Sequence, residues 1–190
     1  MAVIVAMLRG VNVTGRNLIK MEALRALCES LGLRDVQTYV QSGNVVFRTT
    51  QYRTKERNLA ALAKRIEDAI EKSFGFRPAV IVRTTAELRD AVAKNPFAKR
   101  RGINPGKLLV TFLAGDPGAE GRQQVLKIKM DPEELRVNGR EVYIYFPNGM
   151  GRTKLAWPTI ATMLGTSGTG RNWNSVIKLL EMAEKLEAAQ

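Results

Sequence analysis

The order of the apolar segments constrains the fold of this chain more than any other sequence feature. Strand-length apolar runs alternate with longer stretches whose apolar residues recur at helical spacing. In the first half we expect a strand at 2–8, a helix at 21–31, strands at 36–40 and 45–48, a helix at 55–74 and a strand at 78–83. This order, strand-helix-strand-strand-helix-strand, is typical of the split βαβ, ferredoxin-like unit.

The second half of the chain repeats most of this order. We expect a strand at 107–113, a helix at 119–129, a hairpin of strands at 135–137 and 141–146, and a helix at 155–164. The glycine-rich stretch 165–172 then predicts a loop that leads into a last helix. The predicted fold is therefore α+β, with two ferredoxin-like halves and antiparallel sheets. The second half lacks its last strand and ends in a C-terminal helix.

A short basic segment separates the two predicted halves. Thr84 and Glu87 have the spacing of a capping box, and Asn95-Pro96 should stop the helix that they open. The residues that follow are rich in Lys and Arg and contain no carboxylate up to 115. We predict three parts: 1–83 as the first half, 84–106 as a helix and basic linker, and 107–190 as the second half with the C-terminal helix.

Composition excludes several classes of site. The chain has no histidine and one cysteine, so zinc sites of the Cys/His type and histidine-based triads are ruled out, and we predict no metal. Cys28 lies on the apolar stripe of the first predicted helix and is interpreted as a core residue rather than a nucleophile. A formal charge of +12 favours acidic or anionic partners.

The same sequence predicts a location in the cell. Residues 1–8 are apolar, but no basic residue precedes them and Arg9 follows at once, so they lack the layout of a signal peptide. No segment reaches the roughly 18 apolar residues of a membrane helix, and we expect no membrane partner. With a single cysteine, a reducing cytoplasm is the expected compartment.

Polar and cationic residues follow the first strand in a short loop, 9–17. Arg9 and Asn12 supply donors, and the glycines and asparagines of the loop tolerate the backbone angles of a tight turn. In the split βαβ topology this loop should face Gln41, Ser42 and Asn44 across one edge of the sheet. The sequence therefore predicts an anion-binding site there, although a solvated surface turn explains the loop alone equally well.

The second half offers four further candidates for ligand binding, in loops that precede helices: Arg152, Lys154, Arg171 and Asn172. Residues 1–21, 36–55 and 142–180 together contain ten basic residues and no Asp or Glu. Neither glycine-rich stretch has the spacing of a Walker loop or of a dinucleotide-binding fingerprint, and we predict no cofactor.

Several motifs together resemble those of a known family. They are Leu8-Arg-Gly-Val-Asn-Val13, Thr38-Tyr-Val-Gln-Ser-Gly-Asn-Val-Val-Phe47, Asn95-Pro-Phe97, Gly151-Arg-Thr-Lys-Leu155 and Arg171-Asn-Trp-Asn174. This set resembles the bacterial domain of unknown function 1697 over nearly the whole chain. The resemblance implies a cytoplasmic protein of two ferredoxin-like halves, with no established activity to transfer. Thr14 and Gly170 depart from the family pattern, which usually has a glycine and a threonine there.

Three functions from different classes remain open on the sequence. The leading hypothesis is binding of a small phosphorylated or carboxylated ligand, a nucleotide among the candidates. If a reaction is catalysed, acyl or phosphoryl transfer fits, with cations that stabilise developing negative charge. The second hypothesis is nucleic-acid binding through a basic surface, which the scarcity of aromatic residues in the first and third strands disfavours. The third is an interaction or scaffold protein without a ligand, and the oligomeric state is open.

Overall fold

A computed structural model of the chain describes residues 1–52, 56–128, 130–153 and 157–189. Over these residues it has an α+β architecture with six α-helices and two four-stranded antiparallel sheets. The chain divides into two compact units. Unit 1 comprises Met1–Arg89 and Lys178–Gln190, and unit 2 comprises Asp90–Ile177. The last helix, α6 (Trp173–Ala188), therefore begins in unit 2 and ends in unit 1.

The elements of unit 1 follow the order that the sequence predicts. They are β1 (Ala2–Leu8), α1 (Met21–Ser30), β2 (Arg34–Tyr39), β3 (Asn44–Thr49), α2 (Glu56–Phe74), β4 (Val80–Thr84) and the start of α3 (Thr85–Ala93). The strands lie in the order β2-β3-β1-β4. The predicted start of the second helix, Lys55, lies outside the described residues.

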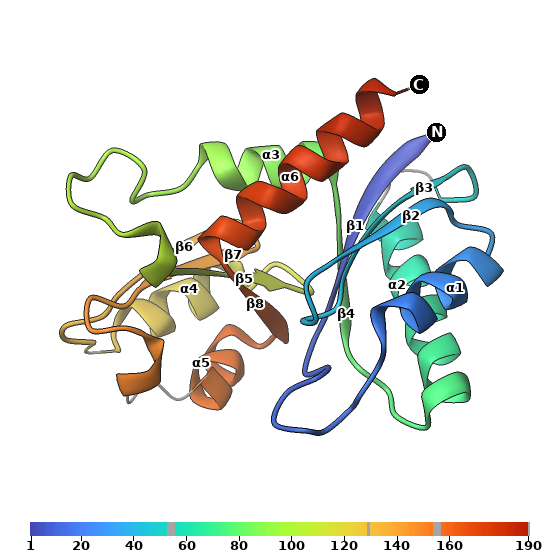
Figure 1. Ribbon diagram of the computed structural model, residues 1–190. Helices are drawn as coiled ribbons and strands as arrows, with labels where there is room; N and C mark the ends of the chain where they lie inside the picture. Colours follow the sequence, from blue (N-terminus) through green and yellow to red (C-terminus); the bar gives the residue numbers. More distant parts are fainter. Residues whose placement is uncertain (53–55, 129, 154–156, 190) are drawn as a thin grey trace. The chain divides into compact units, whose positions relative to one another are not determined.

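The central strand β1 is buried on both faces. Ile4, Ala6 and Leu8 belong to the apolar core that α1 and α2 cover, and the two helices lie side by side on that face of the sheet (Figure 1). Val3 and Val5, which point to the opposite face, are buried as well. Because both faces are dry, the strand is a continuous apolar run instead of an alternating one.

The end of α6 is tied to unit 1 by arginines. Arg48 on β3 donates a hydrogen bond to the carbonyl of Leu186 and forms an ion pair with Asp35 at 2.9 Å. Arg89 pairs with Glu184 at 2.8 Å.

The capping box that opens α3 is confirmed: the Thr84 amide donates to the Glu87 carboxylate at 2.8 Å, and the Glu87 amide donates to the Thr84 hydroxyl at 3.1 Å.

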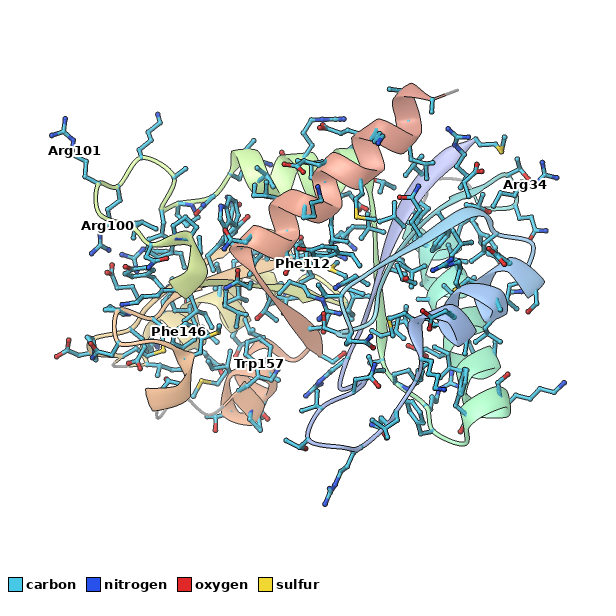
Figure 2. The ribbon with its side chains drawn as sticks, in the orientation of Figure 1. Arg34, Arg100, Arg101, Phe112, Phe146 and Trp157 are labelled. Carbon is cyan, nitrogen blue, oxygen red and sulfur yellow. The ribbon has the colours of Figure 1, made fainter. Side chains whose placement is uncertain are left out.

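Unit 2 contains the second sheet, in the order β6-β7-β5-β8. Its elements are β5 (Leu108–Leu113), α4 (Gly118–Leu126), β6 (Glu134–Asn138), β7 (Glu141–Tyr145), α5 (Trp157–Leu164) and β8 (Gly168–Asn172), with short 3-10 turns at Pro105–Lys107 and Met150–Arg152. α4 and α5 cover one face. Phe146 is buried in the core of this unit, and Trp157 at the start of α5 is partly buried against that core (Figure 2). The predicted helix limits Lys129 and Leu155 lie outside the described residues.

The prediction that the second half lacks its last strand is wrong. Gly168–Asn172 forms β8, which pairs antiparallel with β5. Glycine has low strand propensity, so the sequence pattern of this stretch favours a loop. In the folded chain the glycines allow close approach: a Cβ added at Gly168 would lie 2.9 Å from the Phe112 carbonyl oxygen, and one at Gly170 would lie 3.2 Å from Leu109.

We predict that Gly168→Ala destabilises the protein. A methyl group 2.9 Å from a carbonyl oxygen and 2.9 Å from Thr111 Cγ2 forces the backbone of β8 away from β5. Overpacking of this kind costs about 1–3 kcal/mol, measurable by denaturant unfolding. The matched control is Gly151→Ala, where an added Cβ meets nothing within 4 Å. Equal stabilities of the two variants would contradict the prediction.

A second prediction concerns Cys28, which is fully buried in the core of unit 1. Burial, together with the nearby charge of Glu29, raises the pKa of this thiol to about 12. The native thiol should therefore label slowly even at pH 9, because the thiolate is the reactive form. Cys28→Ser should lower the unfolding free energy by about 1–3 kcal/mol, since a hydroxyl enters an apolar core without a partner. Rapid labelling of the folded protein would refute this account.

Candidate functional site

The candidate site lies at one edge of the unit 1 sheet, where β1 ends and β3 and β4 begin. The Leu8 amide donates to the Gly43 carbonyl at 2.8 Å, and the Arg9 amide donates to the Ala79 carbonyl at 2.9 Å. The loop after β1 and the turn before β3 are therefore neighbours, which confirms the proximity predicted from topology. We refer to residues 9–19 and 40–43 together as the loop edge.

Asn12 holds the two segments of the loop edge together. Its side-chain amide donates to the carbonyl of Ile19 at 2.9 Å and to that of Gln41 at 2.8 Å. Its side-chain oxygen accepts from the Ile19 amide at 2.9 Å. Asn12 has a φ of 53°, in the left-handed region that asparagine tolerates better than most residues. One side chain thus fixes both loops, so the amide is already engaged in structure.

The tip of the first loop is a small hairpin. The Asn12 amide donates to the Asn17 carbonyl at 3.1 Å, and the Arg16 amide donates to the Val13 carbonyl at 3.0 Å. Thr14 and Gly15 between them have φ values of 49° and 75°, which matches a type I′ turn. The Asn17 side chain closes the base of the hairpin with a 3.0 Å bond to the Gly10 carbonyl.

The turn before β3 fits closely against this loop. Asn44 is buried, and its side-chain amide donates to the Tyr39 carbonyl at 3.0 Å and to the Ser42 hydroxyl at 2.9 Å. Gly43 is buried at φ 74°, and a Cβ there would lie 2.5 Å from Val11. The conformation and the close contact together require glycine at this position.

The loop edge presents cations to solvent. Arg9 and Arg16 are exposed, and neither makes an ion pair or a side-chain hydrogen bond with the described residues. Gln41 and Ser42 are exposed next to them. The predicted site residues in unit 1 are therefore brought together, with Asn12 and Asn44 holding the backbone and Arg9, Gln41 and Ser42 at the surface.

Sequence reasoning missed an apolar component of the loop edge. Val13, Leu18 and Val40 are 54%, 66% and 49% exposed, three of the six large apolar side chains exposed among the described residues. Val40 also has a φ of 50°, which is strained for a β-branched residue. The sequence signal for this component was the presence of apolar residues outside any helical or strand periodicity. Whether such residues are exposed can be seen only in the structure.

The candidates in unit 2 make contacts within that unit. Arg171 on β8 is 6% exposed and donates to the Thr169 hydroxyl at 2.8 Å and to the Gly170 carbonyl at 2.9 Å. Burial lowers the pKa of its guanidinium to about 10. The amide of Asn172 donates to the Gly106 carbonyl at 2.9 Å, and its oxygen accepts from the Asn174 amide at 3.0 Å.

The remaining two candidates of the second half are Arg152 and Lys154. Arg152 lies in the 3-10 turn before α5, and Lys154 lies outside the described residues. Among the residues that the structure describes, no group of three or more His, Cys, Asp or Glu side chains could hold a metal ion. No helix in the described ranges is both long enough and apolar enough to span a membrane.

Fold and loop edge define an α+β protein with two antiparallel sheets and a polar, cationic loop site on the first. The chain belongs to the family described as protein of unknown function (DUF1697), which matches residues 1–143 and confirms the resemblance seen in the motifs. A comparison with curated proteins finds no match. The chain is similar in fold to the conserved bacterial protein SP0830 from Streptococcus pneumoniae, with a TM-score of 0.69 and 19% identity, over 96% of this chain and 98% of that one.

We predict that Asn12→Ala destabilises unit 1, because it removes two donated bonds and one accepted bond at once. The expected loss is about 1–3 kcal/mol in denaturant unfolding. Asn12→Ala also loses stability because alanine is strained at a φ of 53°, a conformation that glycine adopts without strain. The loss of stability in Asn12→Gly therefore reports the missing hydrogen bonds alone. Asn148→Ala, at an exposed asparagine of unit 2, is the control. A stability of Asn12→Gly equal to that of the parent chain would show that these bonds do not stabilise the fold.

Proposed function

We propose that the protein binds a small anionic ligand, phosphorylated or carboxylated, at the loop edge of unit 1. The observation that carries this proposal is the pair of exposed guanidinium groups, Arg9 and Arg16, which have no carboxylate partner among the described residues. Both lie on a loop whose backbone is fixed by Asn12 and Asn17. An anion at this edge would neutralise charge that the described residues leave uncompensated.

Preorganisation supports the proposal. A guanidinium makes two parallel hydrogen bonds to a phosphate or carboxylate, which gives it geometric selectivity that a lysine lacks. Residues 1–21 and 36–55 contain no Asp or Glu, so no acid of these segments competes for the cations. The loop does not have to become ordered on binding, and the entropic cost of association is reduced accordingly.

The exposed apolar side chains suggest the nature of the rest of the ligand. Leu18 and Val40 each precede a residue whose carbonyl accepts from Asn12, so their backbones lie near the same amide. An apolar or planar group could cover them while the anionic group meets Arg9. A nucleotide has both parts, which keeps nucleotides among the proposed ligands.

The hypothesis also includes ligand binding by four residues of the second half: Arg152, Lys154, Arg171 and Asn172. The evidence for ligand binding is stronger for the unit 1 residues than for these four. Arg171 is buried and both ends of the Asn172 amide are engaged within unit 2. Their contacts favour a stabilising role in β8 and at the start of α6. Ligand binding by these four residues stays a prediction.

We also infer that both halves are ferredoxin-like, split βαβ units. The strand orders β2-β3-β1-β4 and β6-β7-β5-β8 support this inference, because each places the first strand of its half between the third and the fourth. The division of the sequence at 83 and 106 and a cytoplasmic location stay predictions. A single, buried cysteine is compatible with a reducing compartment.

Nucleic-acid binding is the second candidate, favoured by the charge of +12. Arg100 and Arg101 lie on the loop after α3 and Arg34 lies on β2 (Figure 2), so exposed cations occur in both units. Stacking of bases on the unit 1 sheet is disfavoured, because β3 is buried along its length and both faces of β1 are covered. Binding through phosphates alone would weaken steeply with salt.

We predict that Arg9→Gln weakens the binding of ADP and inorganic phosphate by about tenfold, the loss expected for charge-assisted hydrogen bonds. Isothermal titration calorimetry measures the affinity, and thermal unfolding should be unchanged because the side chain of Arg9 has no partner among the described residues. The matched control is Arg34→Gln. Arg34 is an exposed arginine on β2, opposite Arg48 on the neighbouring strand β3. The loop edge adjoins Asn44, at the other end of β3, so Arg34 lies away from the proposed site within the same unit.

The outcomes separate the functional hypotheses. Equal loss in Arg9→Gln and Arg34→Gln, together with a steep salt dependence, would favour a diffuse basic surface and hence nucleic acid. No binding of either probe to the parent chain would contradict the proposed anion site. Arg9→Lys tests the geometric argument: it keeps the charge, and it should recover only part of the affinity.

A further inference from the structure

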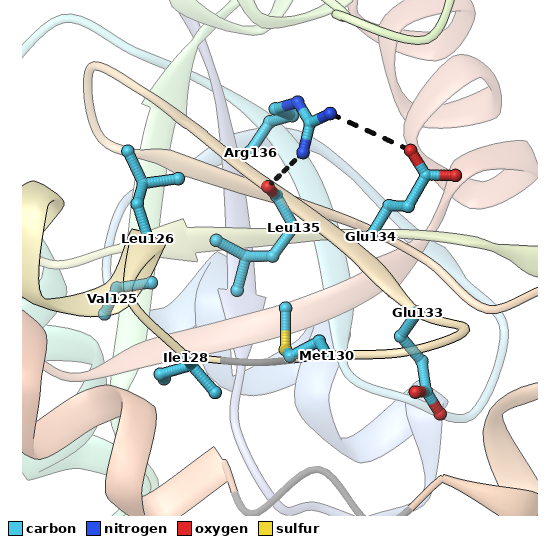
Figure 3. A pocket seen from close by; sticks show the side chains of 8 residues that line it. All are labelled: Val125, Leu126, Ile128, Met130, Glu133, Glu134, Leu135 and Arg136. Atoms are coloured by element: carbon cyan, nitrogen blue, oxygen red, sulfur yellow. Dashed lines mark hydrogen bonds and ion pairs between the residues drawn. The ribbon is translucent and has the colours of Figure 1, made fainter.

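A pocket in unit 2 shares no residue with the proposed anion site and is built from different chemistry. It has a volume of about 170 Å³ and lies between the end of α4 and the strand β6 (Figure 3). Its apolar lining includes Val125, Ile128, Met130 and Leu135. Val125 and Leu135 are buried in the unit 2 core, so this wall of the pocket is fixed by packing.

The size of the pocket limits the ligand. An apolar cavity of about 150 Å³ is large enough to hold benzene. The pocket therefore accommodates one six-membered ring or a branched chain of similar bulk, and it is too small for a nucleotide. Ile128 and Met130 are partly buried and supply adaptable apolar contacts around such a group.

The two carboxylates at the pocket differ in whether they form ion pairs. Glu134 forms an ion pair with Arg100 and lies 3.8 Å from Arg136, whose guanidinium also donates to the Leu135 carbonyl at 2.9 Å. Glu133 makes no ion pair or hydrogen bond with the described residues. Two guanidinium groups thus lie at Glu134, and Glu133 is the carboxylate of the lining that has no ion-pair partner among the described residues.

We propose that this pocket binds a small primary amine whose ammonium group is attached to a ring-sized apolar group. The apolar part lies against Met130 and Leu135, and the ammonium group pairs with Glu133. The net charge of the chain repels cations at long range, but at physiological salt this repulsion is screened beyond about 8 Å. Within that distance the carboxylate of Glu133 attracts the ammonium group and disfavours anionic analogues.

The proposal is independent of the anion site, which lies in unit 1 and involves none of these residues. The test titrates the full chain with benzylamine, benzyl alcohol and benzoate, followed by chemical-shift changes in NMR spectra. We expect saturable binding of benzylamine with changes concentrated at 125–136. Benzyl alcohol should bind about threefold to fivefold more weakly, the contribution of a partly exposed ion pair, and benzoate should not bind.

Two variants and a control complete the test. Glu133→Gln should reduce benzylamine affinity to that of benzyl alcohol and leave benzyl alcohol unaffected. Ile128→Trp should fill the pocket and abolish binding of both, with a folded protein verified from the dispersion of its spectrum. Glu22→Gln, at an exposed carboxylate of α1, is the control and should change nothing. Equal affinity for benzylamine and benzyl alcohol, unchanged binding by Glu133→Gln, or shift changes outside 125–136 would overturn the proposal.

Discussion

Burial of β1 on both faces is the constraint on which unit 1 depends. The strand pairs with β3 on one side and β4 on the other, so its register fixes both neighbours. The same pairing brings the loop after Leu8 beside the turn at Gly43 and the start of β4. Exposed arginines therefore lie at a defined edge because the pairing of β1 with β3 and β4 determines where the strand ends.

Much of this architecture could be predicted from local patterns. The continuous run 2–8, the helical stripe that contains Cys28 and the Thr84–Glu87 capping box each have a direct physical signature, and each has the expected structure. β8 could not be predicted in the same way, because its glycines are required by the close approach of Phe112 and Leu109 from the neighbouring strand. Strand propensity describes a residue alone, whereas this requirement arises only after β5 is in place.

The candidate site shows a similar division. Topology was sufficient to place Arg9 near Gln41, since the end of β1 and the start of β3 must share an edge. It could not distinguish residues that hold the loops from residues that are available to a ligand. Asn12 and Asn44 have the donors expected of ligand contacts, and they use them on backbone carbonyls. The apolar exposure of Leu18 and Val40 also depends on how the loops fold.

Net charge is a coarser guide to partners than the placement of each charge. Arg48, Arg83 and Arg171 count toward the formal +12, yet all three are buried. A phosphate cannot contact these groups directly, although they still contribute to the field around the protein. Arg77 is held by Glu67, Asp68 and Glu71, and Arg122 by Asp116. Recognition of an anion therefore depends on exposed cations without carboxylate partners, and at the loop edge two of them lie on one loop whose backbone is held by Asn12 and Asn17.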